Sequence, residues 1–260
     1  MSNLINPKLG IFEKTPKVPL ASLPSAALFQ AITRYEISDY GGNIATAVNG
    51  VWRFEFPFRT TWANRPPVNL VSPGTELQAT DYENQKWISN GTVWRPAQGR
   101  VLIYAKVTDS LATPLATLSA AGIFAIPGGS PKIPAGMIIT QMKVCACTQF
   151  RKYGTAASLS VNVKLGTTGG FVDQYLCGGS IANNNTGDMK ANGFAFFGGG
   201  ATKYISGGWQ AENAASYGGV VTEISSNVNT QADMWVTPAV TVLTAPDTVG
   251  VLSHQVWLEA

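Results

Sequence analysis

The sequence predicts an all-β protein with an N-terminal extended arm, a small duplicated β-hairpin module and a C-terminal β-sandwich that is jelly-roll-like. From Arg34 onward, short runs rich in β-branched and aromatic residues alternate with Gly, Asn and Pro turns, and long amphipathic helical patterns are absent. In addition, one segment recurs 42 residues later. The 260 residues are enough for two domains that each bury a core.

The composition excludes several classes of partner. Charged residues make up 13% of the chain, about half of the ~25% typical of soluble proteins, and the net charge is only +3. Because no Lys/Arg stripe is present either, we expect no nucleic-acid partner. No apolar run reaches the ~18 residues of a membrane span, and the start MSNLINPKLGIFEK lacks the apolar core of a signal peptide. We therefore expect no membrane partner and synthesis in a cytosol.

Residues 1–33 form the predicted arm. Prolines are scattered through it among Lys and apolar residues, and neither a helical nor a strand period is sustained. Such a segment cannot bury itself, so we expect it to be mobile alone or to lie along a neighbouring subunit. Only SLPSAALFQAI suggests a short helical turn.

Residues 34–106 form the predicted duplicated β module. In two places an Asp-Tyr pair precedes a Trp-Arg pair by 13 positions: Asp39-Tyr40 with Trp52-Arg53, and Asp81-Tyr82 with Trp94-Arg95. Each copy also holds an Asn-Gly pair, Asn49-Gly50 or Asn90-Gly91. Asn-Gly favours a type I′ hairpin turn, since both central residues need positive φ. We therefore expect each copy to be a small β unit with its hairpin tip at Asn-Gly.

Aromatic and basic side chains are concentrated in this module. Its tryptophans are Trp52, Trp62, Trp87 and Trp94. Tryptophans can stack on sugar rings, but in a domain of short strands they more often form the core, which we expect here. Arg53 and Arg95 each follow a Trp and should point to the opposite face of the strand. There they could pair with Asp39 or Asp81, or meet a neighbouring subunit.

Residues 107–136 mix Ala, Thr, Gly and Pro, hold one clear strand, GIFAI, and are predicted to connect the two domains. In residues 137–260, apolar runs and Gly-rich loops are spaced as in a β-sandwich or jelly roll. Cys145 and Cys147 share one face of a predicted strand, and an odd total of three cysteines argues against a disulfide framework. We interpret both as buried small hydrophobes.

Signals for catalysis are weak. The only histidine, His254, shares a strand face with Leu252 and Val256, so we expect a packed, hydrogen-bonded residue rather than a catalyst. No sequence motif marks a Ser or Cys as a nucleophile for it, and the 15 acids form no paired motif. KLGTTGG lacks the Gly-Lys-Ser/Thr end of a phosphate loop. We therefore predict that the protein is not an enzyme and uses no cofactor.

A long polar loop offers oxygen ligands to a cation, at Asn183, Asn184, Asn185 and Asp188. Calcium prefers several carboxylates, and this loop supplies only one. A zinc site needs about four ligands, which one His and a distant Cys177 do not supply. We therefore predict no metal and interpret the segment as an exposed loop at one end of the sandwich.

The run from Trp62 to Lys106 resembles a module that recurs in virion proteins of tailed bacteriophages. That module has an Arg-Pro, a Pro-Gly-Thr, an Asp-aromatic pair and an Asn/Asp-Gly-Thr-x-Trp-Arg-Pro tip. The matching residues are Arg65-Pro66, Pro73-Gly74-Thr75, Asp81-Tyr82 and Asn90 to Pro96. The earlier copy, from Tyr35 to Phe56, lacks the Thr of the tip and the Pro after Arg53.

The second half is similar to the jelly-roll domains of phage fibre and appendage proteins. The matching motifs are Ile133 to Gly136, Val161 to Gly166 and Leu258-Glu259. Together the two resemblances imply a structural, non-enzymatic virion component, made in the bacterial host cytoplasm and commonly a homotrimer. Residues 1–106 would dock on other virion proteins, and the C-terminal domain would face outward for host attachment.

The resemblance leaves three functions to weigh. The first is a tail fibre or tail-associated appendage, and the second is a head decoration or head fibre protein. The third, a glycan-degrading tailspike-type enzyme, is disfavoured because the chain lacks a long repetitive β-helix. We expect a virion or subunit contact at Arg53, Arg95, Arg100 and Trp62. Host-surface glycan binding would fall to Tyr204, Trp209 and Tyr217, which could instead pack between subunits.

Overall fold

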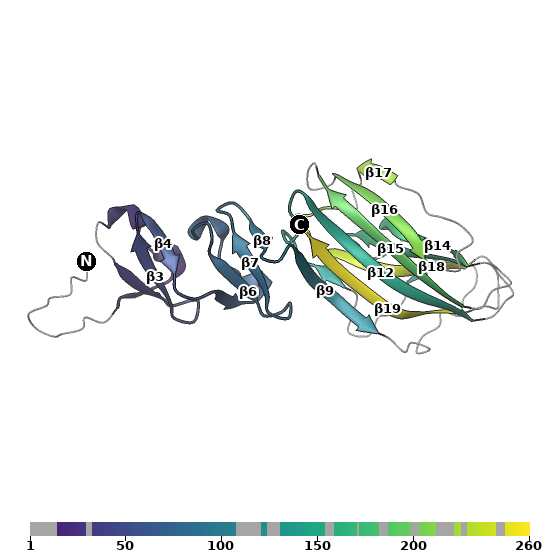
Figure 1. Cartoon of the computed structure of the whole chain (residues 1–260), viewed down its shortest axis with the longest axis horizontal. Helices are drawn as coiled ribbons and strands as arrows, with labels where there is room; N and C mark the ends of the chain where they lie inside the picture. Colours follow the sequence, from purple (N-terminus) through teal and green to yellow (C-terminus); the bar gives the residue numbers. More distant parts are fainter. Residues whose placement is uncertain are drawn as a thin grey trace, which may run out of the picture. The chain divides into compact units, whose positions relative to one another are not determined.

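The computed structural model of the chain consists of two compact units, residues 1–99 and residues 100–260. It describes residues 15–29, 33–107, 121–123, 131–153, 159–170, 172–181, 187–198, 203–211, 221–224, 228–242 and 248–260. Within these ranges every regular element is a β-strand or a short 3-10 turn, which confirms the all-β prediction. No helix among the described residues has the length and apolar character needed to cross a membrane. Figure 1 labels the strands of both units.

The first unit contains the same four-stranded sheet twice. The first sheet has the order β1-β2-β3-β4, with strands Lys17–Val18, Arg34–Ile37, Asn43–Val48 and Val51–Phe54. The second has the order β5-β6-β7-β8, with strands Phe58–Thr60, Glu76–Ala79, Gln85–Ser89 and Trp94–Pro96. In each sheet the first two strands are parallel and the other neighbours are antiparallel.

Two 3-10 turns separate the parallel strands in each copy. They are Leu20–Ser22 (η1) and Ala26–Leu28 (η2) in the first copy, and Trp62–Asn64 (η3) and Val68–Leu70 (η4) in the second. These turns carry the chain from one parallel strand to the next without an α-helix. The duplication therefore includes residues before position 34, which the sequence patterns did not indicate.

Two hydrogen bonds recur in both copies. The carboxylate of Asp39 accepts the backbone N–H of Leu20 at 3.0 Å, and that of Asp81 accepts the N–H of Trp62 at 2.9 Å. The indole N–H of a tryptophan donates to a proline carbonyl. This bond joins Trp52 to Pro24 at 2.7 Å, and Trp94 to Pro66 at 3.1 Å. The repeat is thus preserved in these hydrogen bonds, even though the equivalent positions hold Leu20 in the first copy and Trp62 in the second.

Residues 15–29 differ from the extended arm expected for residues 1–33. Lys17 and Val18 pair with β2, and Leu20 and Ala26 are buried against the rest of the copy. This segment folds because its partners are supplied by β2 and Trp52, 19 to 28 residues later, rather than by its own periodicity. Residues 1–14 and 30–32 lie outside the described ranges.

The two Asn-Gly pairs adopt different turns. Asn49 and Gly50, with φ of 52° and 76°, form the expected two-residue hairpin turn between β3 and β4. Of the second pair, only Gly91 has positive φ, and a four-residue loop joins β7 to β8. There the Asn90 side-chain oxygen accepts the N–H groups of Thr92 and Val93. This side-chain turn replaces the type I′ turn that the sequence predicts.

The tryptophans of the first unit form its core, as expected. Trp62 and Trp87 are 1% and 0% exposed, with ring centres 4.4 Å apart, and Trp94 is also buried. In the first copy the rings of Trp52 and Tyr35 meet edge to face at 5.6 Å. Burying several large aromatic rings in each copy gives these small sheets their stability.

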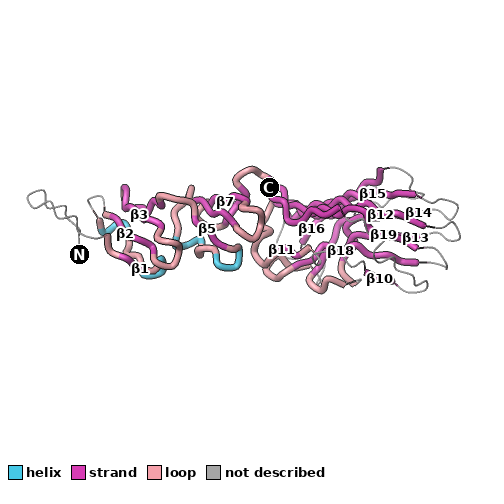
Figure 2. The backbone as a smooth tube through the Cα atoms, turned by 90° about the horizontal axis from the view of Figure 1, so that it is seen from below, coloured by secondary structure: helices cyan, strands magenta, loops and turns pink. Residues whose placement is uncertain are grey.

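The second unit is a sandwich of two antiparallel sheets (Figures 1 and 2). One sheet has the order β17-β16-β15-β12-β19-β9, and the other has the order β10-β18-β13-β14, with β11 also paired to β18. The first sheet contains Val221–Ile224, Lys203–Ala211, Gly187–Phe197, Met142–Tyr153, Thr248–Glu259 and Arg100–Val107. The second contains Ala121–Ile123, Met234–Val242, Leu159–Gly166, Gln174–Ile181 and Lys132–Ile133.

The sandwich therefore begins earlier than the expected position 137. Strand β9, assigned from sequence to the duplicated module, pairs with β19, and its Val101 is buried. Strands β10 and β11, expected in a connection, both pair with β18. Such edge additions depend on partners more than a hundred residues away, so local patterns do not indicate them. Residues 108–120 and 124–130 lie outside the described ranges.

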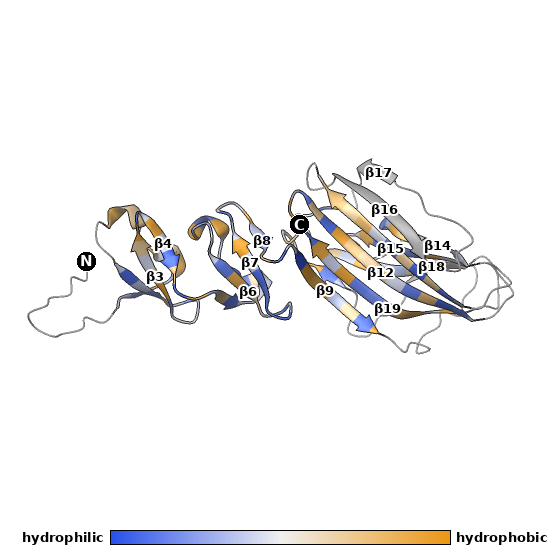
Figure 3. Ribbon diagram, in the orientation of Figure 1, coloured by the Kyte–Doolittle hydropathy of each residue, from blue (hydrophilic) through white to orange (hydrophobic). Residues whose placement is uncertain are grey.

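Side chains alternate along β12, and a bulge at Leu252 shifts the alternation of β19 by one residue. Figure 3 shows hydrophilic and hydrophobic residues alternating along both strands. Val144, Thr148 and Phe150 of β12 face the core and are buried. His254 of β19 lies beside them, fully buried, with Nδ1 2.7 Å from the Thr148 hydroxyl and Nε2 3.2 Å from the Val236 carbonyl of the other sheet. Because a carbonyl only accepts, Nε2 carries the proton and a neutral ring joins both sheets.

Burial lowers the pKa of His254 to about 4, so the pH dependence of unfolding tests this core contact. As the pH falls from about 6.5 toward about 4, the unfolded chain binds a proton that the folded chain does not, and stability decreases by up to roughly 3 kcal/mol. Urea unfolding between pH 4.5 and pH 8 should show this loss in the native chain, and His254→Gln should flatten the curve. Equal slopes for both proteins would contradict the assignment.

The aspartate that holds each pair of 3-10 turns should also be a measurable source of stability. Asp81→Ala leaves the backbone N–H of Trp62 without its acceptor, and we expect unfolding of the first unit to become easier by about 1–2 kcal/mol. Asp81→Asn keeps an oxygen acceptor and serves as the matched control. Tryptophan fluorescence during urea unfolding measures both variants. Equal free energies of unfolding for Asp81→Ala and Asp81→Asn would mean that this hydrogen bond does not stabilise the first unit.

Candidate functional site

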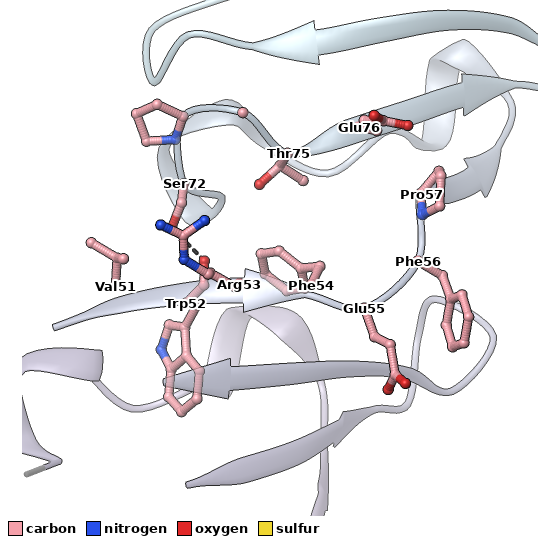
Figure 4. A pocket seen from close by; sticks show the side chains of 12 residues that line it. Val51, Trp52, Arg53, Phe54, Glu55, Phe56, Pro57, Ser72, Thr75 and Glu76 are labelled. Atoms are coloured by element: carbon pink, nitrogen blue, oxygen red, sulfur yellow. Dashed lines mark hydrogen bonds between the residues drawn. The ribbon is translucent and has the colours of Figure 1, made fainter. Parts of the chain in front are cut away.

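A groove lies between the two copies of the first unit, along the outer side of β4. It has a volume of about 350 Å³ and is lined by residues 51–57 and 72–76. Figure 4 shows β4 on one wall, the segment around Ser72 and Thr75 on the other, and Phe54 between them. Two of its apolar side chains, Phe56 and Val51, are 60% and 41% exposed. The groove thus presents apolar surface to solvent.

The groove exists because β4 is an edge strand. Its inner side pairs with β3, whereas the carbonyl of Trp52 points outward and accepts the Ser72 hydroxyl at 2.6 Å (Figure 4). The ring of Phe58 contacts those of Tyr40 and Phe54, with ring centres 5.0 and 4.8 Å away. These contacts hold the two copies together around the groove. An edge strand beside a groove that is lined by both polar and apolar residues is suited to bind an extended peptide segment.

The predicted contact residues fall in different environments. Arg53 is exposed and lines the groove, while Arg95 is exposed on β8. Both point away from the buried Trp that precedes them, as expected. Asp39 and Asp81 accept backbone N–H groups instead. Among the described residues no ion pair joins either aspartate to Arg53 or Arg95. Trp62, placed with the arginines as a contact residue, lies in the core instead.

The outer face of the six-stranded sheet carries a second cavity, which sequence reasoning missed. It has a volume of about 550 Å³. Its lining residues are Lys143, Cys145, Ala146, Asn192, Gly193, Phe194, Trp257 and Glu259. Cys145 pairs with Phe194 on one side and with Trp257 on the other, so the two aromatic residues flank a small one. The alternation of β12 could have indicated the small central residue, but only the pairing of three distant strands reveals the aromatic neighbours.

Charged groups surround these aromatic rings. The guanidinium of Arg100 lies over the Trp257 ring, 4.3 Å from its centre, and the ammonium of Lys143 lies 6.0 Å from the centre of Phe194. Glu259 accepts the thiol of Cys145 at 3.7 Å. Arg100, expected at a subunit or virion contact, is thus a cation–π partner of Trp257.

The cysteines are free thiols. Cys145 is buried and Cys147 is half-buried on the same face of β12, and Cys177 is buried in the opposite sheet. Burial, together with the nearby Glu259, raises the pKa of Cys145 to about 12, and burial raises the pKa of Cys147 and Cys177 as well. Thiols with raised pKa values are poor nucleophiles. The burial expected from the sequence is confirmed for Cys145, whereas Cys147 is only half-buried.

The polar loop considered for a cation is only partly described. Asn183, Asn184 and Asn185 lie outside the described residues. The Asp188 carboxylate accepts from Arg151 at 2.5 and 2.8 Å and from Gln149 at 2.9 Å. The hydrogen bonds from Arg151 hold the pKa of Asp188 below its usual value. Among the described residues no group of three or more His, Cys, Asp or Glu side chains could hold a metal ion.

The aromatic residues expected to touch a glycan are also only partly placed. Tyr204 and Trp209 belong to β16, where Trp209 pairs with Asn192 of β15. Tyr217 lies outside the described residues. Trp209 therefore lies one strand away from the cavity that Asn192 and Phe194 line.

Comparison with known proteins yields little. No protein-family model matches the sequence, and no curated protein matches it. One solved structure with a partial likeness is the Lectin I from Ulex europaeus in complex with the methyl glycoside of alpha-L-fucose. The two chains are 11% identical with a TM-score of 0.25, over 63% of this chain and 87% of the lectin chain.

The bond between the two copies can be tested by removing one hydroxyl group. Ser72→Ala leaves the outward carbonyl of Trp52 without its donor, so we expect the first unit to lose about 1 kcal/mol of stability. Ser22→Ala changes an exposed serine of η1 and is the matched control. Calorimetric melting compares the two variants. A melting temperature for Ser72→Ala equal to that of the control would mean that this bond does not stabilise the first unit.

Proposed function

We propose that the chain is a structural, non-enzymatic component of a bacteriophage virion, a tail fibre or tail-associated appendage. The first unit docks on another virion protein, and the sandwich is presented outward for host attachment. The observation that carries the proposal is the groove between the two copies, with an open edge strand, exposed Phe56 and Val51, and Arg53 on its wall. One of the phage-type motifs of the second copy, Pro73-Gly74-Thr75, lines this groove.

The chemistry of the described residues supports a structural role. The single histidine is neutral, fully buried and held between the two sheets, and burial lowers its pKa to about 4. The thiols are packed and have raised pKa values. Neither kind of group is poised as a base or nucleophile. Repeated β units also suit a protein whose role is to hold other parts at a distance.

The docking role predicts which surface changes remove the protein from particles. Phe56→Ser with Arg53→Glu alters two exposed residues of the groove, so the chain should still fold but should be at least tenfold depleted from purified phage particles. Val107→Ser changes another exposed apolar side chain, 85% accessible, in the second unit and should have no effect. Quantitative immunoblotting of particles of the encoding phage measures incorporation.

Particle incorporation and antibody labelling separate the alternatives. Normal incorporation of the groove variant would contradict the assignment of the groove as the docking site. Absence of the native chain from particles would contradict the virion assignment. Antibody labelling then locates the protein in electron micrographs. Label at the tail supports the proposal, whereas label over the head lattice would favour a head decoration or head fibre protein.

A further inference from the structure

The outer face of the six-stranded sheet contains a slot with aromatic walls. Three rows of outward residues cross β19, β12 and β15 there, and each row has one residue from each strand. The rows are Glu259, Lys143 and Phe196; then Trp257, Cys145 and Phe194; then Gln255, Cys147 and Asn192. The middle row has large rings at both ends and a thiol at its centre. The slot, defined by this middle row, coincides with the cavity of about 550 Å³.

The width of the slot fits a single ring. Trp257 and Phe194 stand on strands two positions apart, which places their Cβ atoms roughly 9.5 Å from one another. A ring between two aromatic faces needs about 3.5–4 Å on each side, so the slot has room for one ring and not two. Cys145, between them, is 6% exposed and forms the floor.

The two aromatic walls have different neighbours on the strands outside the slot. Arg100 comes from β9, on the far side of β19 from the slot, and its guanidinium covers the Trp257 ring without lining the cavity. Phe194 pairs on its other side with Gly207 of β16, which has no side chain. The Arg100 guanidinium therefore covers one face of the indole, while Trp257 itself lines the cavity with Cys145 and Phe194.

The polar groups at the two ends of the slot define the ligand's chemistry. One end has the ammonium of Lys143 beside the carboxylate of Glu259, and the other has the amides of Gln255 and Asn192. Among the described residues no ion pair joins Lys143 to Glu259, but their opposite charges lie in one row of the sheet and offset each other, so this end favours an uncharged ligand that both donates and accepts hydrogen bonds. The hydroxyl groups of a sugar do both, and its C–H faces stack on aromatic rings.

We propose that this slot binds an uncharged pyranose ring of a glycan, with Trp257 and Phe194 as the walls and Lys143, Glu259 and Asn192 binding its hydroxyl groups. The site does not include Tyr204, Trp209 or Tyr217, which the sequence suggested. It does not depend on the virion assignment, since the slot lies wholly within the second unit.

Binding of simple sugars by the full-length protein tests the proposal. The probes are the methyl glycosides of glucose, galactose and N-acetylglucosamine, with glucuronate and indole for comparison, and the measurements are saturation-transfer NMR and calorimetry. We expect saturable binding of at least one neutral glycoside with a dissociation constant on the order of 1 mM. Glucuronate and indole should bind at least fivefold more weakly. Saturable binding of indole with none of any neutral glycoside would overturn the proposal.

Variants of the slot connect binding to its walls. Trp257→Ala and Phe194→Ala should each lower the affinity for the glycoside at least tenfold. Trp257→Phe keeps an aromatic ring, so its affinity should fall less than threefold. Lys190→Ala removes an exposed side chain of β15 outside the slot and should bind like the native protein. Circular dichroism would reveal whether Trp257→Ala misfolds, and in that case Trp257→Phe and Phe194→Ala still test the slot. Native-like affinity of a folded Phe194→Ala chain would refute the proposal.

One further measurement separates a sugar site from a subunit contact. Light scattering after size exclusion should give the same mass for the native protein and for Trp257→Ala. If the variant instead dissociates an oligomer, the slot is covered by a second copy of the chain, and the sugar-binding proposal is wrong.

Discussion

The alternation of side chains along the central strand β12 is the constraint on which the second unit depends. One set of residues, with Val144, Thr148 and Phe150, faces the core, and the other set, with Lys143 and Cys145, faces outward. Because the side-chain period is two residues, a shift of the pairing by one residue would exchange these sets. The register that places His254 beside Thr148 therefore also places Trp257 beside Cys145. Core and outer cavity are two consequences of one pairing.

The first unit is organised by a different kind of constraint, since the same hydrogen bonds recur at equivalent positions of both copies. An aspartate accepts a backbone N–H, and a tryptophan N–H donates to a proline carbonyl, in each copy. Both bonds use backbone groups as one partner, so they tolerate a change from Leu20 to Trp62 at the neighbouring position. These hydrogen bonds all lie within one copy, and β4 is the edge strand of the first sheet. Between the copies that edge becomes the groove.

Several features could be predicted from local patterns because their causes are local. The hairpin at Asn49-Gly50 follows from the positive φ of both residues, and the burial of Trp52 and exposure of Arg53 follow from alternation. The packed role of His254 follows from its apolar strand face. The fold of residues 15–29 could not be predicted, because their partners lie on β2 and at Trp52. The turn at Asn90 differed because its own side chain caps the loop.

The sequence by itself determined the all-β class, the existence of a repeat and the aromatic core of the first unit. Each of these depends on periodicity, turn residues or composition, which act over a few positions of the chain. Only the tertiary structure decided that β9 belongs to the sandwich, that a groove separates the two copies, and that Trp257, Cys145 and Phe194 form one row. These features arise from pairing between strands that are far apart in sequence, and no local pattern specifies which strands become neighbours.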